Sequence, residues 1–220
     1  MSFSCTARLV AEVVVAFVLL GVPLLVPQRR APIPFERNNP AHAFPSTPSG
    51  WPYPVVLVVG TAAVVVAAAV AARKHDSFRF FVVSVTTYIC AASATKCLTD
   101  VLKRMIGRPR PCAWALVDAG RTDNAFRSFP SGHSSTVFCA MLFTTLVLWS
   151  AFARGRRSLL RLAACCAPMG FAVLVAVSRL VEFHHHYDDV VAGALIGSAI
   201  AGACFATRLG QWASPPLGLP

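Results

Sequence analysis

The chain has 220 residues, of which 56% are hydrophobic and only 13% are charged. A soluble domain of this length needs far more charged surface, so the composition excludes one and predicts an integral membrane protein. The net charge is +11, from 20 basic and 9 acidic residues. A polytopic membrane protein has no broad soluble face for nucleic acid, so the positive charge indicates membrane flanks and an anionic substrate.

Six apolar stretches each come close to the roughly 20 residues that a helix needs to cross a bilayer core of about 30 Å. They predict an all-α fold, in which residues 1–220 form a single bundle of six transmembrane helices. The first stretch has no small-residue cleavage site, which favours a retained helix over a signal peptide. The expected spans are 9–26, 54–72, 80–102, 134–152, 162–181 and 189–206.

The segment between the first two spans, residues 27–53, is rich in proline and polar residues and has no helical periodicity. This pattern predicts an irregular loop. A plain connector is the first interpretation, and a lid over the path by which a lipid enters is the second.

The third span contains a lysine, Lys96, and an aspartate, Asp100. A lysine at mid-membrane costs roughly 2.5–3.5 kcal/mol on insertion scales, so Lys96 is expected to face the bundle or to extend toward the interface. For Asp100 we expect an ion pair with Arg104, four residues later on the helix.

The stretch from Lys103 to His133 combines strong cations with the start of a helix, separated by a short polar loop. The planar guanidinium of Arg110 can hold two phosphate oxygens, and Lys103 adds a compact charge. Pro130 suits the first turn of a helix, which leaves the next amides free. The amides of Gly132 and His133 therefore form a predicted anion cradle.

A second polar stretch, residues 178–189, adds Arg179 and a histidine and an aspartate four residues apart. On a helix these two positions share a face, so Asp189 is expected to fix the tautomer of His185 and leave its other nitrogen free as a nucleophile. His133 is then a second imidazole, able to protonate a leaving oxygen near neutral pH.

The histidines 184–186 with Asp188 and Asp189 also fit a metal site, which is the alternative interpretation. A metal centre needs further ligands, and nearby cations repel a divalent ion, so we prefer a nucleophilic His185. We expect His184 and His186 to face the interface and Glu182 to pair with Arg179. Arg104 and Arg108 are expected to be interfacial anchors or outer supports of a phosphate site.

Three patterns together resemble the type 2 phosphatidic acid phosphatase superfamily, which includes the lipid phosphate phosphatases. The family patterns are a lysine followed by six residues and then Arg-Pro, next Pro-Ser-Gly-His, and last Ser-Arg followed by a histidine and an aspartate. All three are intact and in order, and the resemblance covers roughly residues 80–207. They stand here as Lys103 with Arg110-Pro111, as Pro130-Ser131-Gly132-His133, and as Ser178-Arg179 with His185 and Asp189.

The resemblance implies a metal-independent phosphatase without a cofactor, in which His185 forms a phosphohistidine, Asp189 orients it and His133 protonates the departing alcohol. The phosphate ligands that it implies are Lys103, Arg110, Ser131, Gly132 and Arg179. Phosphatidate and related lipid phosphomonoesters in the bilayer are the expected substrates. The alternatives are an isoprenyl diphosphate or diacylglycerol pyrophosphate phosphatase, a non-catalytic lipid-binding relative, and a transporter. The small residues of 193–202, which suit a transporter, are more simply explained as helix-packing sites.

Six spans place the loops after the first, third and fifth helices on one side, which brings all three motifs to one membrane face. The loops after the second and fourth helices are short and basic, as cytoplasmic loops are. We therefore favour cytoplasmic termini and a site that faces the lumen or the exterior. The basic residues of those two loops are Arg73, Lys74, Arg79, Arg154, Arg156, Arg157 and Arg161.

Overall fold

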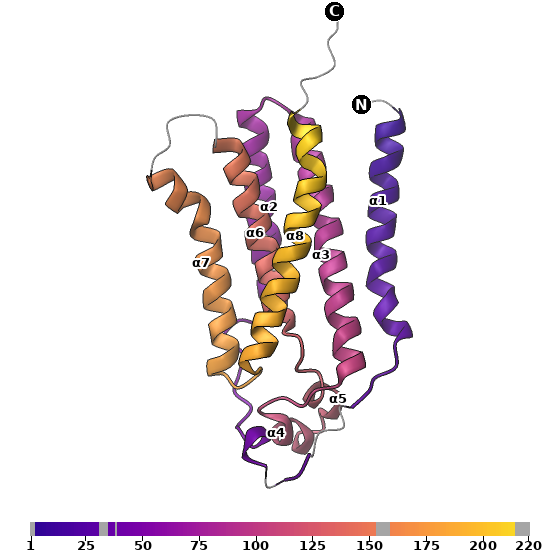
Figure 1. Ribbon diagram of the computed structural model, residues 1–220, viewed down its shortest axis with the longest axis vertical. Coiled ribbons are helices and arrows are strands. Elements are labelled where there is room, and N and C mark those ends of the chain that lie inside the picture. The colour runs from indigo at the N-terminus through magenta and orange to yellow at the C-terminus, as the bar shows by residue number, and fades with distance from the viewer. Residues whose placement is uncertain (1–2, 31–34, 38, 153–158, 214–220) are drawn as a thin grey trace, which may run out of the picture.

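A computed structural model describes residues 3–30, 35–37, 39–152 and 159–213. In these ranges all regular structure is helical and no strand occurs, which confirms the all-α prediction (Figure 1). The long helices are α1 (Phe3–Gly21), α2 (Tyr53–Lys74), α3 (Phe78–Ile106), α6 (Gly132–Phe152), α7 (Leu159–Val181) and α8 (Tyr187–Ala213). The short ones are η1 (Val22–Leu25), η2 (Pro40–His42), α4 (Ala113–Asp118) and α5 (Thr122–Ala125).

Among the described residues, five helices are long and apolar enough to cross a membrane: α2, α3, α6, α7 and the part of α8 from Tyr187 to Arg208. The apolar stretch that runs through α1 and η1, Leu9–Leu25, is shorter. All six predicted spans coincide with helices, but the count of six spans stays a prediction. Helices α1 and α7 expose large apolar side chains such as Phe17 and Leu174, which suits contact with lipid.

Helix α6 lies at the centre of the bundle and packs against α2, α3, α7 and α8 (Figure 1). It contributes Val137, Phe143 and Val147 to the apolar core, and all three are fully buried. Each apolar side chain that is removed from water stabilises a fold by about 1.5–3 kcal/mol, and in a bilayer close packing takes over this role.

Two glycines of α8 bring it unusually close to α6. A Cβ at Gly193 would lie 2.5 Å from the carbonyl oxygen of Ser131, and one at Gly197 would lie 2.1 Å from that of Ser135. The helix-packing role predicted for residues 193–202 is therefore confirmed at these two positions. At Gly202 an added Cβ meets nothing within 4 Å. The close contact holds the starts of α6 and α8 side by side.

Helix α3 ends just after Lys103 because Gly107 adopts the left-handed conformation, with φ of 60°. Its amide donates to the carbonyl of Lys103 at 3.1 Å, which caps the helix. A Cβ at Gly107 would lie 2.0 Å from the carbonyl oxygen of Arg29. The segment that follows α1 is therefore packed directly against the end of α3, and the Arg29 amide donates to Arg104 at 2.8 Å.

The described parts of the connection 26–52 (26–30, 35–37 and 39–52) lie at the same end of the bundle as the connections 107–131 and 182–186 (Figure 1). The connection 107–131 contains α4 and α5, so its prediction as a short polar loop is wrong. It has a small core of its own, in which Leu116 and Phe126 are buried. Phe35 covers this core and stacks on Trp114 with ring centroids 4.2 Å apart. The end of the bundle is thus a folded cap.

Replacing Gly197 with alanine should destabilise the bundle by about 1–3 kcal/mol, because the new methyl group collides with the backbone of α6. The matched variant Gly202→Ala adds the same methyl group to the same helix in open space and should be neutral or slightly stabilising. Thermal unfolding of both variants in detergent measures the difference. Equal melting temperatures for the two would contradict the close contact between α6 and α8.

Candidate active site

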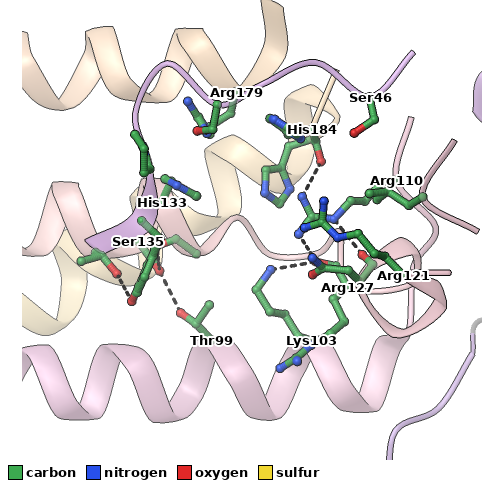
Figure 2. Close-up of a pocket in the computed structure, with 18 of the residues that line it drawn as sticks. Ser46, Thr99, Lys103, Arg110, Arg121, Arg127, His133, Ser135, Arg179 and His184 are labelled. Carbon is green, nitrogen blue, oxygen red and sulfur yellow. Dashed lines mark hydrogen bonds between the residues drawn. The ribbon is translucent and has the colours of Figure 1, made fainter. Parts of the chain in front are cut away.

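A cavity of about 480 Å³ opens at the end of the bundle that holds the three motifs (Figure 2). Two of the predicted site residues, Ser131 and Asp189, are fully buried and do not line it. The other six line it: Lys103, Arg110, Gly132, His133, Arg179 and His185. Residues that are far apart in the sequence therefore share one cavity.

Lys103 and Arg110 are held by backbone carbonyls rather than by carboxylates. The Lys103 ammonium donates to the carbonyl of Arg127 at 2.9 Å, and Nε of Arg110 donates to that of Asn124 at 2.9 Å. Burial, together with the positive charges of Arg127 and Arg121, lowers the pKa of Arg110 to about 10, which leaves it protonated at neutral pH. The positive charge of Arg110 therefore remains available to an anion.

Arg179 is 1% exposed and is fixed from two sides. It forms the predicted ion pair with Glu182, at 2.9 Å, and donates to the hydroxyl of Ser49 at 2.7 Å. Ser49 belongs to residues 46–52, which we call the strap. The Glu182 carboxylate also accepts from the amide of Gly50 at 3.0 Å, and its carbonyl accepts from the hydroxyl of Thr47 at 2.8 Å. The strap forms one wall of the cavity and is more than a connector.

The start of α6 is capped by Ser131, whose hydroxyl accepts from the amide of Ser134 at 3.4 Å and from its hydroxyl at 3.1 Å. The helix begins at Gly132, so Pro130 lies outside it and the prediction of a first-turn proline is wrong. The first amides of a helix have no partner inside it, which leaves those of Gly132 and His133 at the cavity. The hydroxyl of Ser131 is directed to the helix instead.

His133 also contacts the segment that carries the strap. Its Nε2 lies 3.1 Å from the carbonyl oxygen of Trp51, and its ring meets that of Tyr53 edge to face at 5.4 Å. Because a carbonyl only accepts, Nε2 carries the hydrogen in this contact. The strap therefore sets the tautomer and the orientation of this imidazole.

The carboxylate of Asp189 is buried and bound on both oxygens. Arg108 donates to one oxygen at 2.9 Å, and the hydroxyl of Ser128 donates to the other. The amide of His186 donates to this second oxygen at 2.8 Å, and its Nδ1 lies 3.2 Å away. The Asp189 carbonyl accepts from the amide of Ser131 at 2.9 Å. Arg108 thus acts as an outer support of the site, one of the two roles expected for it.

Nδ1 of His185 lies 3.6 Å from the Asp189 carboxylate, slightly beyond hydrogen-bond length. The two residues do not share a helix face, because α8 begins at Tyr187 and His185 precedes it. That premise of the sequence analysis is wrong. The turn 182–186 brings His185 into place, and its amide donates to the carbonyl of Arg179 at 3.3 Å. The orienting role of Asp189 stays a prediction.

Burial lowers the pKa of His185 well below its usual value, and the charges of Arg110 and Lys103 act in the same direction. His184 also lines the cavity, where burial and the charges of Arg110 and Arg179 lower its pKa. Both imidazoles are therefore neutral at neutral pH. A neutral imidazole has a free lone pair, which a nucleophile requires.

Lys96 lines the cavity, as expected of a lysine that faces the bundle. It pairs with Asp100, so the predicted Asp100–Arg104 pair is wrong. Arg104 donates instead to the carbonyl of Val26 at 3.1 Å, at the end of η1. The local spacing allowed either partner, and the orientation of α3 decided between them.

The prediction that His184 and His186 face the interface is also wrong, since one lines the cavity and the other contacts Asp189. Sequence reasoning missed His42, which is buried with Nδ1 3.3 Å from the carbonyl oxygen of Arg110. It also missed Arg121 and Arg127, although both are cations between two motifs. In the described part of the chain, no three His, Cys, Asp or Glu side chains are grouped to hold a metal ion.

Comparison with known proteins gives the family. The family model described as the PAP2 superfamily matches residues 81–212, which include all three motifs. The chain belongs to the PAP2 superfamily. No solved structure matches it significantly.

Three relatives illustrate the extent of the similarity. A PA-phosphatase related-family protein of Dictyostelium discoideum is 36% identical over 137 residues, which are 59% of this chain and 50% of that protein. Lipid phosphate phosphatase 1 of Arabidopsis thaliana is 32% identical over 143 residues (56% and 43%). Phospholipid phosphatase 2 of Mus musculus is 30% identical over 142 residues (56% and 51%). The chain spans about half the length of these relatives.

The buried histidines predict a stability that falls in mild acid. The pKa of His185 is lower in the folded protein than in the unfolded chain, where it is about 6.5. The contribution of the neutral imidazole to the free energy of unfolding is therefore complete above about pH 6.5, and it is lost as the pH falls below this value, because the unfolded chain then binds a proton that the folded protein does not. Chemical denaturation in detergent at pH 7.5 and pH 5 should show the loss, with a slope of up to about 1.4 kcal/mol per pH unit for one such group. His185→Asn should lose less stability over the same interval, and an unchanged pH dependence in that variant would contradict the buried neutral state.

Proposed function

We propose that the protein hydrolyses lipid phosphomonoesters, phosphatidate among them, by a metal-independent route through a phosphohistidine. The observation that carries the proposal is the cavity in which a neutral imidazole, that of His185, meets three basic side chains, the buried Lys103 and Arg179 and the half-buried Arg110. Such a site attracts a phosphate dianion and offers it a nucleophile. Several relatives are named as lipid phosphate or phospholipid phosphatases, which supports the substrate class.

The three cations and the free amides at the start of α6 bind the non-bridging oxygens of the phosphate, and we call these groups together the phosphate cradle. Each charge-assisted hydrogen bond contributes roughly 1.5–3 kcal/mol, and the contacts strengthen as charge builds in the transition state. Ser131 supports this cradle by capping α6, and its hydroxyl reaches the phosphate only if it leaves the helix end. The fixed cations take the part that Mg²⁺ plays in many phosphoryl transfers.

His185 attacks the phosphorus through Nε2, because its Nδ1 faces Asp189. The bond between phosphorus and the ester oxygen breaks, its electron pair stays on that oxygen, and His133 supplies the proton that completes the alcohol. Water then attacks the phosphohistidine with His133 as the base, and inorganic phosphate is released. In the neutral ring the hydrogen is on Nε2, which donates to Trp51, so His133 gives a proton to the ester oxygen from Nδ1 only after this nitrogen has taken one up from water.

The membrane arrangement belongs to the same proposal. We place six spans in the bilayer, with α1 and η1 as the first, cytoplasmic termini, and the cavity on the side of the lumen or the exterior. The last turn of α2 and the first turn of α3 lie at the opposite end of the bundle and carry the basic residues Arg73 and Arg79, which supports this orientation. Three further cations of the predicted basic loops, Arg154, Arg156 and Arg157, lie outside the described residues.

The part of the cavity wall around Lys96, which we call its inner end, indicates which class of alcohol is the leaving group. Lys96 lies seven residues before Lys103 on α3, so it is about 10 Å farther from the helix end and nearer the bilayer centre. Asp100, Tyr53 and Thr136 accompany it in the cavity wall. These polar groups suit an alcohol with oxygen or nitrogen atoms beside the ester, as in glycerol or sphingoid lipids. An isoprenyl chain is hydrocarbon at that point and offers these groups no hydrogen bond beyond those that they make with one another.

The nucleophile is tested by phosphate release from a panel of phosphatidate, lysophosphatidate, diacylglycerol pyrophosphate and isoprenyl diphosphates, in detergent with chelator present. His185→Asn should lower kcat by about 10³-fold or more, and no acid-labile phosphoprotein should form from radiolabelled substrate. His75→Asn, at the opposite end of the bundle, is the matched control. Full activity of His185→Asn would remove this residue as the nucleophile, and loss of wild-type activity with chelator would favour the metal alternative.

The leaving alcohol is tested by Lys96→Met. This variant should lower kcat/KM for phosphatidate by about fivefold relative to an isoprenyl monophosphate, since one polar contact is lost on only one of the two substrates. Lys74→Met, at the far end of α2, is the charge-matched control. A wild-type preference for the isoprenyl monophosphate, or an equal loss for both substrates, would contradict the role of the inner end.

A further inference from the structure

Two arginines at the aqueous end of the cavity belong to none of the three motifs. Arg121 precedes α5 and Arg127 follows it, and both line the cavity. Both also line a second, more open hollow of about 430 Å³ on the outer side, together with Thr122, Asp123 and Asn124. Arg121 and Arg127 therefore stand between the cavity and the surrounding water.

Neither guanidinium has a carboxylate partner among the described residues. The nearest acid of the outer hollow, Asp123, forms no ion pair with either of them within that part of the chain. Nε of Arg127 is buried and makes no hydrogen bond there. Buried polar groups normally have partners, so the guanidinium of Arg127 has hydrogen-bonding capacity that the described residues do not use.

Arg110 connects these arginines with the phosphate cradle. Figure 2 shows Arg110, Arg121 and Arg127 gathered at one end of the cavity, with His133 and Ser135 at the other. The carbonyl of Arg127 accepts from Lys103 at 2.9 Å and from Arg110 at 3.4 Å, so the backbone of Arg127 contacts the inner cations directly. A phosphate that leaves the cradle on this side meets further cations at once.

We propose that Arg121 and Arg127 form a second, outer phosphate site, which receives inorganic phosphate on its way from the cradle to water. The assignment to product release rests on the proposed function. The lipid has its tails in the bilayer and reaches the cradle past the inner end, whereas the product is a small dianion that must leave to water. Guanidinium groups bind phosphate oxygens in two-point contacts, and unpaired cations next to the cradle lower the cost of separating the product from it.

Inorganic diphosphate is a suitable probe, because its two linked phosphates contact the cradle and the outer site together. In isothermal titration calorimetry of the full chain in detergent, with chelator and at constant ionic strength, it should bind more tightly than inorganic phosphate. The variant Arg121→Gln/Arg127→Gln should weaken diphosphate binding by about tenfold or more and phosphate binding by much less. Arg73→Gln, which removes a charge at the opposite end of the bundle, should change neither.

Equal affinities of the wild type for the two anions, or equal weakening of both in the double variant, would overturn the outer site. If the double variant is not folded, as its melting temperature will show, Arg121→Gln alone replaces it, because the Arg121 side chain is exposed. The binding data are independent of turnover. Absence of hydrolysis of every lipid phosphate would refute the proposed function alone, whereas hydrolysis with unchanged anion binding would refute the outer site alone.

Discussion

One buried carboxylate, that of Asp189, ties the three motif segments together. Its oxygens accept from Arg108, which lies within the first motif, from Ser128, which precedes the second, and from His186 within the third. A charge that is taken out of water is tolerated only when it is fully paired. Any arrangement that separates these segments leaves Asp189 unpaired at a cost of several kcal/mol, so the same contacts that satisfy it also assemble the cavity.

The strap closes the other side of the site by similar means. Glu182 pairs with Arg179 and binds the amide of Gly50, while Ser49 accepts from the same arginine. A segment with no regular structure is thereby fixed to the turn between α7 and α8. The α6–α8 contact acts in the same direction, since Gly197 lets the two helix starts lie together. The cavity is therefore held by helix packing, by Asp189 and by the strap.

The sequence predicted what local patterns encode. Apolar length predicted the helices, and spacing singled out six residues that line the cavity. It did not predict the partners of Asp189, or that His185 lies on a turn before α8, because both depend on how separate segments meet. The choice of Asp100 between Lys96 and Arg104 was open for the same reason. The cap of α4 and α5 was missed because these helices are only six and four residues long and are stabilised by contacts with distant residues such as Phe35.

The distribution of counter-charges explains how one site can hold several cations and still bind an anion. The carboxylates near the cavity are used where they orient groups: Asp189 beside the imidazoles, and Glu182 on Arg179 and the strap. Lys103 and Arg110 are held by carbonyl oxygens, which fix their position without cancelling their charge. Neutral dipoles stabilise a buried cation only in part, and the remaining stabilisation comes from the anion that binds. The folded protein thus retains an electrostatic preference for phosphate in the cavity before any substrate arrives.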